Sequence, residues 1–337
     1  MDPIVPEAQK RFGVSYAVTD TGLELPVIDV THPAFAIAPT DAELDALAAA
    51  FQEMMARQRD ATEQQLAALR SMLEASILGR GMLAGSGTFL TGLDTYLMKL
   101  GPDNLGAYAV DVDRQIARAL GPVSMRMRLQ NVTAFMAEAL GPALDSAPGA
   151  PLHLVNIAGG PAIDSLNALI LVRQDWPSAL SGRPIHIHVF DQDTAGPAFG
   201  ARALKALMEP GAKLHGLDVT FTHVRYDWRQ TDTLARALSS LDLERAVWAA
   251  SSEGGLFEYG SDDEIVANLR VLRECGNGGT VSGTVTRDGG PAAASPRASF
   301  FATIPRTLAV FEALAAQAGW AVDRSIVVPY SIDVRLR

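Results

Sequence analysis

The chain has 337 residues, 48% hydrophobic and 20% charged, which is typical of a soluble globular protein with a sizeable core and about two domains. Its formal net charge of −10 argues against a nucleic-acid partner, because phosphate backbones select a basic protein face. The single cysteine, Cys275, excludes an intrachain disulfide and fits a reducing, cytoplasmic setting.

Membrane and metal partners are not expected either. Residues 1–13 have no apolar signal-peptide core, and no stretch reaches the roughly 18 uninterrupted apolar residues of a membrane helix. His186 and His188 alternate along a predicted strand and therefore share a face, but a metal site would need a third ligand that the sequence does not nominate. We expect these histidines to be satisfied by packing or hydrogen bonds.

The first 140 residues predict a mainly helical region. Two short β-type runs on either side of Asp20-Thr21-Gly22 indicate a hairpin or an extended arm. Thr40 and Glu43 form a capping box that begins a helix, with apolar residues following at helical spacing. Further helices are expected over 61–78, 93–100, 105–120 and 123–140, with a glycine-punctuated stretch over 79–92.

This helical region is interpreted either as a small bundle or as a cap over the ligand site of the next domain. Tyr108, Arg128 and Asn131 are its candidate substrate-binding residues. Arg128 and Asn131 are one helical turn apart and share a face, so they either contact solvent or line a pocket.

Residues 141–151 look like a linker, which divides the chain into a helical N-terminal domain (1–145) and a second domain (146–337). Strands and helices alternate after it, which predicts a largely parallel sheet with helices on both faces. The expected strands are 152–157, 185–190, 219–224, 246–250 and 280–285, and the helices 163–173, 196–208, 231–238, 263–274 and 307–318. Two last runs, 320–328 and 331–336, are joined so tightly that they must be antiparallel. Residues 289–297 predict a loop of small residues.

Polar residues gather where the predicted parallel strands end, which is where open α/β sheets bind ligands. The first strand leads into Ala158-Gly159-Gly160-Pro161, and the second ends at Asp191 and Asp193, where a carboxylate can hydrogen-bond both hydroxyls of a ribose. The third ends at Asp227 and Trp228, a carboxylate and a ring suited to the amino group and the face of adenine. The fourth ends at Ser251-Ser252-Glu253, which should lie nearest the reacting atoms.

Residues 151–337 resemble the class I S-adenosylmethionine-dependent methyltransferases. That family has seven strands, the last an antiparallel hairpin partner, and the first-strand motif acidic-x-Gly-x-Gly-x-Gly. The matching positions here are Asn156, Ala158, Gly160 and Ala162, so the acidic residue and two of the three glycines are replaced by residues of similar size. The resemblance implies an α/β, Rossmann-like, seven-stranded, mostly parallel sheet with a C-terminal antiparallel hairpin, preceded by the helical domain.

The resemblance also implies S-adenosyl-L-methionine as the cofactor. It places the ribose on Asp191 or Asp193 and the adenine at Asp227 with Trp228. The methionine end would lie along Asn156, Gly159 and Gly160. The cofactor-binding candidates of the same turn and of the fourth strand end are Ala158, Pro161 and Ser251.

Methyl transfer from a sulfonium is an in-line displacement in which the enzyme mainly positions the reactants and excludes water. Where the acceptor is an amine or a hydroxyl, a base helps, and Glu253 is the first candidate for a catalytic base. Glu258 and Tyr259 are the next candidates for contact with the substrate. The acidic residues near the site, Glu253, Glu258, Asp262 and Asp263, suggest a polar or cationic amine acceptor. Asp262 and Asp263 are also expected to cap the next helix with Ser261.

The leading hypothesis is therefore N- or O-methylation of a small-molecule acceptor. Transfer of an aminopropyl or aminocarboxypropyl group from the same cofactor is an alternative, and a non-catalytic adenosyl-binding protein is another. A nicotinamide-dependent dehydrogenase is disfavoured, because the spacing from Gly160 to Asp191 is longer than the usual dinucleotide fingerprint. The sequence does not identify the acceptor, and a homo-oligomer is compatible with it.

Overall fold

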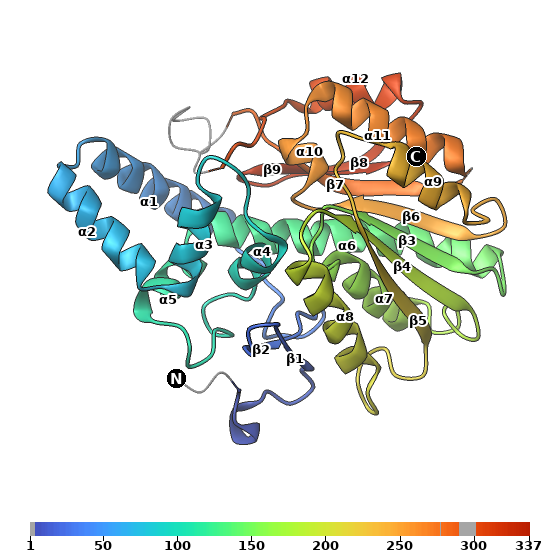
Figure 1. Ribbon diagram of the computed structural model, residues 1–337, viewed down its shortest axis with the longest axis horizontal. Helices are drawn as coiled ribbons and strands as arrows, with labels where there is room; N and C mark the ends of the chain where they lie inside the picture. The colour runs from blue at the N-terminus through green and yellow to red at the C-terminus, as the bar shows by residue number, and fades with distance from the viewer. Residues whose placement is uncertain (1–3, 277, 290–300) are drawn as a thin grey trace.

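A seven-stranded sheet forms the centre of the protein (Figure 1). The computed structural model describes residues 4–276, 278–289 and 301–337. The strand order is β5-β4-β3-β6-β7-β9-β8, and every neighbouring pair is parallel except that β9 runs antiparallel to both β7 and β8. The predicted fold class, a mostly parallel sheet closed by an antiparallel hairpin, is confirmed. The strands are β3 (Leu152–Ile157), β4 (Pro184–Asp191), β5 (Asp218–Arg225), β6 (Val247–Ser252), β7 (Thr280–Thr286), β8 (Val322–Val327) and β9 (Ser331–Leu336).

Strand β3 is the central strand, and its sequence explains why. All six of its residues are buried, and it pairs with β4 on one side and β6 on the other, with Leu154 opposite Ile187 and Ala249. A parallel strand covered by helices on both faces needs apolar side chains in both directions, and the run LHLVNI supplies them with few exceptions.

Helices cover both faces of this sheet (Figure 1). One face packs against the helices of the first apolar cluster, and the other face against those of the second. The first set is α6 (Leu120–Ser146), α7 (Ile163–Asp175) and α8 (Ala195–Met208). The second set is α9 (Asp232–Ser239), the short α10 (Leu256–Tyr259), α11 (Asp262–Cys275) and α12 (Leu308–Gln317).

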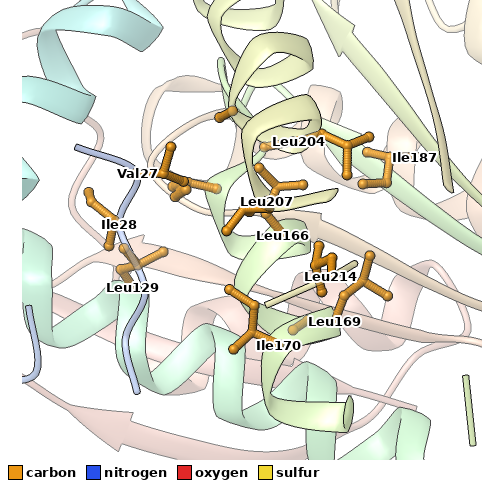
Figure 2. Close-up of a cluster of buried hydrophobic side chains, with 14 of the residues drawn as sticks. Val27, Ile28, Leu129, Leu166, Leu169, Ile170, Ile187, Leu204, Leu207 and Leu214 are labelled. Carbon is orange, nitrogen blue, oxygen red and sulfur yellow. The ribbon is translucent and has the colours of Figure 1, made fainter. Parts of the chain in front are cut away.

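The N-terminal segment shares its core with the sheet domain. Val27 and Ile28 pack into the same apolar cluster as Leu129 of α6, Leu166 of α7 and Leu207 of α8, and all are at most 2% exposed (Figure 2). Burial of such side chains contributes about 1.5–3 kcal/mol each. The segment around Val27 and Ile28 is thus packed on the sheet domain, and the domain boundary at 145 stays a prediction.

The N-terminal elements begin with a hairpin, as one of the two sequence interpretations expected. Strands β1 and β2 are antiparallel, and Thr40 with Glu43 forms the predicted capping box at the start of α1. Helices α1 and α2 project from the body of the molecule (Figure 1), and α1 has no buried residue. The elements are η1 (Glu7–Gln9), β1 (Tyr16–Val18), β2 (Glu24–Pro26), α1 (Asp41–Arg59), α2 (Glu63–Glu74), α3 (Ile77–Gly85), α4 (Gly92–Lys99) and α5 (Asp111–Arg118).

The prediction of one helix over 61–78 was wrong, because the helix is interrupted at Ser76. The Ser76 hydroxyl caps α3 by accepting from the Gly79 amide, and it donates to Asp113 Oδ1 at 2.7 Å. The same carboxylate oxygen accepts from the Leu78 amide at 2.8 Å, and Asp113 is fully buried. A distant carboxylate thus stabilises a helix start that local periodicity did not reveal.

The start predicted for the helix over 105–120 was also wrong, and Asp113 explains why. Its Oδ2 accepts from the Val110 amide at 2.8 Å, which makes residue 110 the N-cap, so α5 begins only at Asp111. The helix ends at Arg118, and α6 begins two residues later.

The linker predicted over 141–151 was also wrong, since α6 continues through Pro142 to Ser146. Gly141 allows this, because a methyl group placed on it would lie 2.3 Å from the ring of Trp176. Leu140 and Leu144 are buried on the same helix, and this packing outweighs the backbone hydrogen bond that a proline inside a helix forfeits.

His186 and His188 share a face of the sheet as predicted, and His153 of β3 stacks beside them. His153 Nδ1 lies 3.0 Å from His188 Nε2, and burial lowers the pKa of both rings to about 4, so they are neutral at physiological pH. Within the described ranges, no group of three or more His, Cys, Asp or Glu residues is arranged to hold a metal ion.

Two further observations concern segments rather than residues. The loop predicted over 289–297 lies, from residue 290 onward, outside the described residues. None of the helices in the described part of the chain is long and apolar enough to span a bilayer.

Candidate functional site

A cavity of about 320 Å³ lies at the carboxyl ends of β3, β4, β5 and β6. Its walls come from the turn after β3 and from the polar ends of the other three strands. Residues 88–92 and helix α4 of the N-terminal region cover it, and we refer to residues 88–99 as the lid. The cavity is within the usual size range for small-molecule sites, at its lower end.

The turn after β3 is shaped by three residues with left-handed backbone. Ala158, Gly160 and Ala162 have φ values of +55°, +57° and +51°. These are the three positions at which the resembled family carries glycine. The two alanines therefore keep the backbone course of a glycine motif at a cost of roughly 1 kcal/mol each.

Asn156 stabilises this turn through hydrogen bonds and does not line the cavity. Its Oδ1 accepts from the Gly159 amide at 3.0 Å, and its Nδ2 donates to Asp164 at 2.8 Å and to Ser251 at 3.1 Å. Both Asn156 and Ser251 are buried. The carboxylate bound to Asn156 is that of Asp164, at the start of α7.

Asp191, at the end of β4, faces the cavity with a fixed carboxylate. Its Oδ2 accepts from the Gly160 amide at 2.9 Å and its Oδ1 from the Asp193 amide at 2.8 Å. Each oxygen retains a lone pair, and burial raises the pKa of the group. Asp193 also lines the cavity, but its two oxygens accept from the Ala195 and Gly196 amides and cap α8.

Asp227 and Trp228, after β5, form the outer wall of the cavity. The Asp227 carboxylate binds the guanidinium of Arg229 through both oxygens, and this contact lowers its pKa. The pair is partly exposed, so its carboxylate stays accessible from the cavity side.

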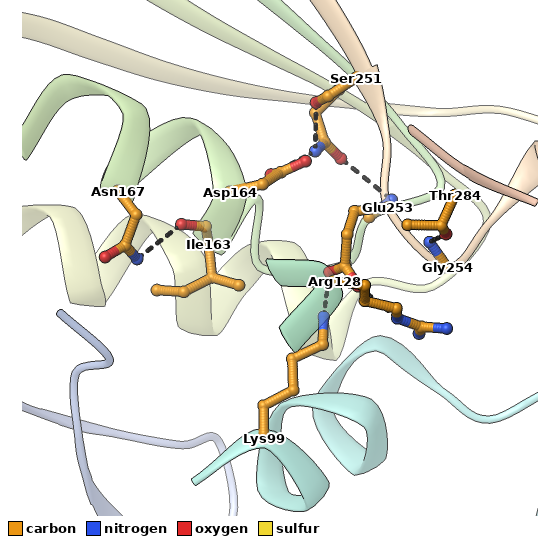
Figure 3. A network of polar contacts seen from close by, with 12 residues as sticks. Lys99, Arg128, Ile163, Asp164, Asn167, Ser251, Glu253, Gly254 and Thr284 are labelled. Carbon is orange, nitrogen blue, oxygen red and sulfur yellow. Dashed lines mark hydrogen bonds and ion pairs between the residues drawn. The ribbon is translucent and has the colours of Figure 1, made fainter. Parts of the chain in front are cut away.

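Glu253, the predicted base, lies at the floor of the cavity and is paired with two cations (Figure 3). Lys99, from the lid, donates to its Oε2, and Arg128 Nε donates to its Oε1 at 2.6 Å. All three side chains are less than 9% exposed. Both oxygens of the Glu253 carboxylate are therefore engaged by cationic donors.

The remaining substrate-binding candidates lie around this floor. Tyr259 lines the cavity, while Glu258 is buried beside it and binds Arg128 Nη1 at 3.0 Å. Arg128 is buried, whereas Asn131 is half-buried and donates to the buried Asp333 at 2.8 Å.

Tyr108 is separate from this group and does not line the cavity. Its hydroxyl has no hydrogen-bond partner among the described residues, and burial raises its pKa to about 12. Its role in substrate binding stays a prediction, as do the roles of the other site residues.

The lid rests directly on the turn after β3. A methyl group placed on Gly160 would lie 2.5 Å from the Gly92 Cα, and the reverse distance is also 2.5 Å. Thr91 caps α4 at this point, and Phe89 packs edge-on against Tyr259 across the cavity mouth. The Ala302 amide donates to the Thr88 carbonyl at 2.8 Å, so the segment after residue 300 is tied to the lid.

The lid is what the sequence reasoning missed. Its residues follow a glycine-punctuated stretch that matched no motif, although the position of Lys99 was a usable signal. A lysine between Met98 and Leu100, in an apolar run of a predicted helix, must find a buried counter-ion or cause the helix to unfold locally. The N-terminal region therefore contributes residues to the cavity, and its role as a cap domain stays a prediction.

Comparisons with known proteins give fold likenesses only. No family model matches the chain, and no curated protein matches it. Among solved structures, the magnesium protoporphyrin IX methyltransferase of Synechocystis PCC 6803, described with bound S-adenosylhomocysteine, has a TM-score of 0.41 and 14% identity over 64% of this chain and 86% of that one.

Two other solved structures show the same level of likeness. The mitomycin 7-O-methyltransferase has a TM-score of 0.35 at 17% identity over 67% of this chain, which spans only 58% of that protein. A protein described as a pericyclic reaction enzyme has a TM-score of 0.39 at 13% identity over 60% of this chain and 46% of that one. Likenesses this distant carry no functional argument, so function is argued from the site.

Proposed function

We propose that this protein is an S-adenosylmethionine-dependent methyltransferase that acts on a small molecule. The observation that carries the proposal is the Asp191 carboxylate. Asp191 lies at the end of β4 and faces the cavity. Its carboxylate accepts from two backbone amides, one of them in the turn after β3. A carboxylate so placed accepts the paired hydroxyls of a ribose, and Trp228 lies further along the same wall for a purine ring.

The residues present fit the adenosyl cofactor. The left-handed turn from Ala158 to Ala162 brings bare backbone to the cavity wall, as a ligand that packs against the chain requires. Gly255 lies opposite, where a methyl group would come within 2.6 Å of the Ala158 carbonyl. Asp227 would take the adenine amino group, and Ala158 and Gly159 would line the methionine end.

When bound, such a cofactor supplies a methyl group activated on a sulfonium. The chain's part is to position the reactants and to exclude water. The lid closes the cavity over the strand ends, and its contact at Gly92 and Gly160 leaves no room for solvent between lid and turn. Alignment of two reactants can lower the activation barrier by up to about 7–11 kcal/mol, and it requires no covalent intermediate with the protein.

The role of Glu253 is proposed differently from the sequence-based hypothesis. Because Lys99 and Arg128 each bind one of its oxygens, we propose that Glu253 holds these cations in place at the floor of the site. Removal of a proton from the acceptor by Glu253 stays a prediction. Tyr259 does not offer a base at neutral pH, because burial raises the pKa of its hydroxyl.

The acceptor is proposed to have an apolar or aromatic body. Three of the four acidic residues that suggested an amine are paired with cations in the structure: Glu253 and Glu258 with Arg128, and Asp262 with Arg306 at 2.8 Å. The mouth of the cavity is lined instead by Phe89, Leu90 and Tyr259. We also propose that the protein is cytoplasmic and has no nucleic-acid partner.

Calorimetric titration with S-adenosylhomocysteine tests the proposal. We expect micromolar binding by the wild type and at least a tenfold loss in Asp191→Asn, because one of the two oxygens that accept ribose hydroxyls becomes a donor. Trp228→Ala provides a second test that leaves the turn unchanged. Asp218→Asn, at the exposed amino end of β5 on the opposite edge of the sheet, is the matched control.

Turnover then separates methyl transfer from its alternatives. S-adenosylhomocysteine should accumulate when S-adenosylmethionine is supplied with a panel of phenols and aromatic amines. Accumulation of methylthioadenosine would instead indicate transfer of the aminopropyl group. A folded protein that binds no adenosyl ligand would contradict the proposal.

A further inference from the structure

Six buried ionisable side chains form one cluster beneath the cavity floor, part of which is drawn in Figure 3. Two of them, Lys99 and Glu253, also line the cavity, so the cluster is continuous with the ligand site. None is more than 7% exposed. We refer to these residues as the floor cluster: Lys99, Arg128, Asp164, Glu253, Glu258 and Asp333.

The floor cluster contains four carboxyl groups and only two cations. Glu253 binds both Lys99 and Arg128, and Glu258 binds Arg128 through both of its oxygens. These two carboxylates therefore use all of the positive charge in the cluster.

Asp164 and Asp333 have only neutral partners. Asp333 accepts from Asn131 Nδ2 at 2.8 Å and from the Ser331 hydroxyl at 2.9 Å. Asp164 Oδ1 accepts from Asn156 and from the Ser165 amide, whereas its Oδ2 is buried with no partner among the described residues. Burial raises the pKa of Asp333 to about 7 and that of Asp164 to about 6.

The groups around each carboxyl come from several elements. Asp333 lies on β9 opposite Thr284 of β7 and Ile326 of β8, with Arg128 and Asn131 of α6 and Glu253 beyond the end of β6 as its polar surroundings. Asp164 has Asn156 of β3, Ser251 of β6, Lys99 of α4 and Glu253 around it. Neither carboxyl has a cation that belongs to it alone.

The residues that line the cavity also include more acidic than basic side chains. The charged residues that line it are five acids, Asp191, Asp193, Asp227, Glu253 and Glu264, and two bases, Lys99 and Arg229. Arg229 is exposed and paired with Asp227, so it adds little positive charge inside.

We propose that the floor cluster makes the cavity select the cationic sulfonium form of the cofactor over its neutral thioether product, with the unpaired carboxyl groups of Asp164 and Asp333 as the specificity-determining residues. The inference rests on the proposed function, since it presumes an adenosyl sulfonium ligand. A buried site with surplus carboxylates favours a ligand that brings a positive charge. When the methyl group leaves, that charge is lost and the product is held less tightly.

Calorimetric titration with S-adenosylmethionine and S-adenosylhomocysteine at pH 5.5 and pH 8 tests this inference. At pH 8 we expect the wild type to bind the sulfonium at least about fivefold tighter than the thioether. At pH 5.5, where Asp333 is protonated and Asp164 is mostly protonated, the ratio should fall toward one. Near pH 6.5, sulfonium binding should release a fraction of a proton, measured as a dependence of the binding heat on the ionisation enthalpy of the buffer.

Isosteric variants assign the effect to the two residues. Asp333→Asn and Asp164→Asn should each lower the pH 8 ratio severalfold and reduce the proton release. Asp242→Asn, which removes one charge from a side chain that is 65% exposed, should leave both unchanged. If one variant fails to fold, the other variant and the wild-type pH series still test the inference.

The possible outcomes are separable. Equal or tighter binding of the thioether at pH 8, or a ratio unaffected by both substitutions, overturns the charge selection while leaving the methyltransferase proposal in place. A folded wild type that binds neither ligand overturns the proposed function itself.

Discussion

At the scale of single residues, Ala158 and Ala162 occupy a backbone conformation that favours glycine. The strain at each alanine is of the same size as the extra entropy that a glycine loses on folding, roughly 0.5–1 kcal/mol. The two terms nearly cancel, so alanine is tolerated in this turn although the motif it departs from contains glycine.

Ala158→Gly should therefore change the free energy of unfolding by less than about 0.5 kcal/mol. Ala168→Gly, at a fully buried position of helix α7, should cost about 1–2 kcal/mol through lost helix propensity and a lost methyl group. Urea unfolding of both variants measures the difference. Equal losses would mean that the left-handed turn carries no strain.

The raised pKa of Asp333 has a consequence for stability. In the folded protein Asp333 stays protonated up to about pH 7, whereas in the unfolded chain an aspartate loses its proton near pH 4. The free energy of unfolding therefore falls as pH rises between those values. The loss is complete above the folded pKa. It is absent below the unfolded pKa, where both states are protonated.

Asp333→Asn should remove this dependence. Relative to the wild type, the variant should gain about 2–3 kcal/mol of stability between pH 5 and pH 8. Denaturant unfolding without ligand at both pH values measures the gain, and Asp242→Asn is the surface control. A constant difference between variant and wild type would show that Asp333 is ionised in the folded state throughout.

At the scale of secondary-structure elements, the lid helix α4 depends on two glycines from distant parts of the chain. Gly92→Ala should displace the lid, because the new methyl group would lie 2.5 Å from the Gly160 Cα. We expect at least a tenfold weaker affinity for S-adenosylhomocysteine, measured by calorimetry, with a much smaller effect on unfolding.

Gly121→Ala is the matched control for this variant. Gly121 is in helix α6, and nothing lies within 4 Å of the methyl group that the substitution adds. Its affinity should equal that of the wild type, with stability equal or slightly higher. Unchanged affinity in Gly92→Ala would mean that the lid does not cover the bound ligand.

Elements were predictable where their determinants are local in the sequence. Strand β3 is an apolar run, and α1 begins with a capping box, so both were found. The break at Ser76 was missed because it depends on Asp113, which is 37 residues away in the sequence. Helix α6 continues through Pro142 where Gly141 packs against the ring of Trp176, a contact that no local pattern shows.

The same distinction applies to the site. Asp191, Asp227 and the turn after β3 were found because strand ends of a parallel sheet meet at one edge. The pairing of Glu253 was not found, because Lys99 and Arg128 are 154 and 125 residues away from it. A residue type at a strand end indicates a position in the site, whereas its chemical role depends on partners brought by other elements.

At the scale of the whole molecule, the N-terminal region and the sheet domain share one apolar core. All four tryptophans, Trp176, Trp228, Trp248 and Trp320, lie after residue 146. Tryptophan fluorescence therefore follows mainly the sheet domain, although Trp176 also packs against Gly141 of α6. Far-UV circular dichroism follows the helices of both regions. The shared core predicts coincident urea transitions by the two methods.

An earlier transition seen only by circular dichroism, and larger than the loss of α1 and α2 explains, would contradict a shared core. Those two helices bury a single residue between them, Leu73, so they are free to unfold first. Hydrogen exchange separates the cases, with fast exchange expected over 41–74 and slow exchange in α6.

The contact between Gly92 and Gly160 also constrains how related sequences can diverge. No residue is smaller than glycine, so a substitution at one position cannot be compensated at the other, and the two positions should be inherited together although they are 68 positions apart in the sequence. A descendant with a side chain at position 92 must have moved its lid away from the strand ends. This single position therefore sorts descendants of the protein into those with a closed cavity and those whose cavity is open to larger acceptors.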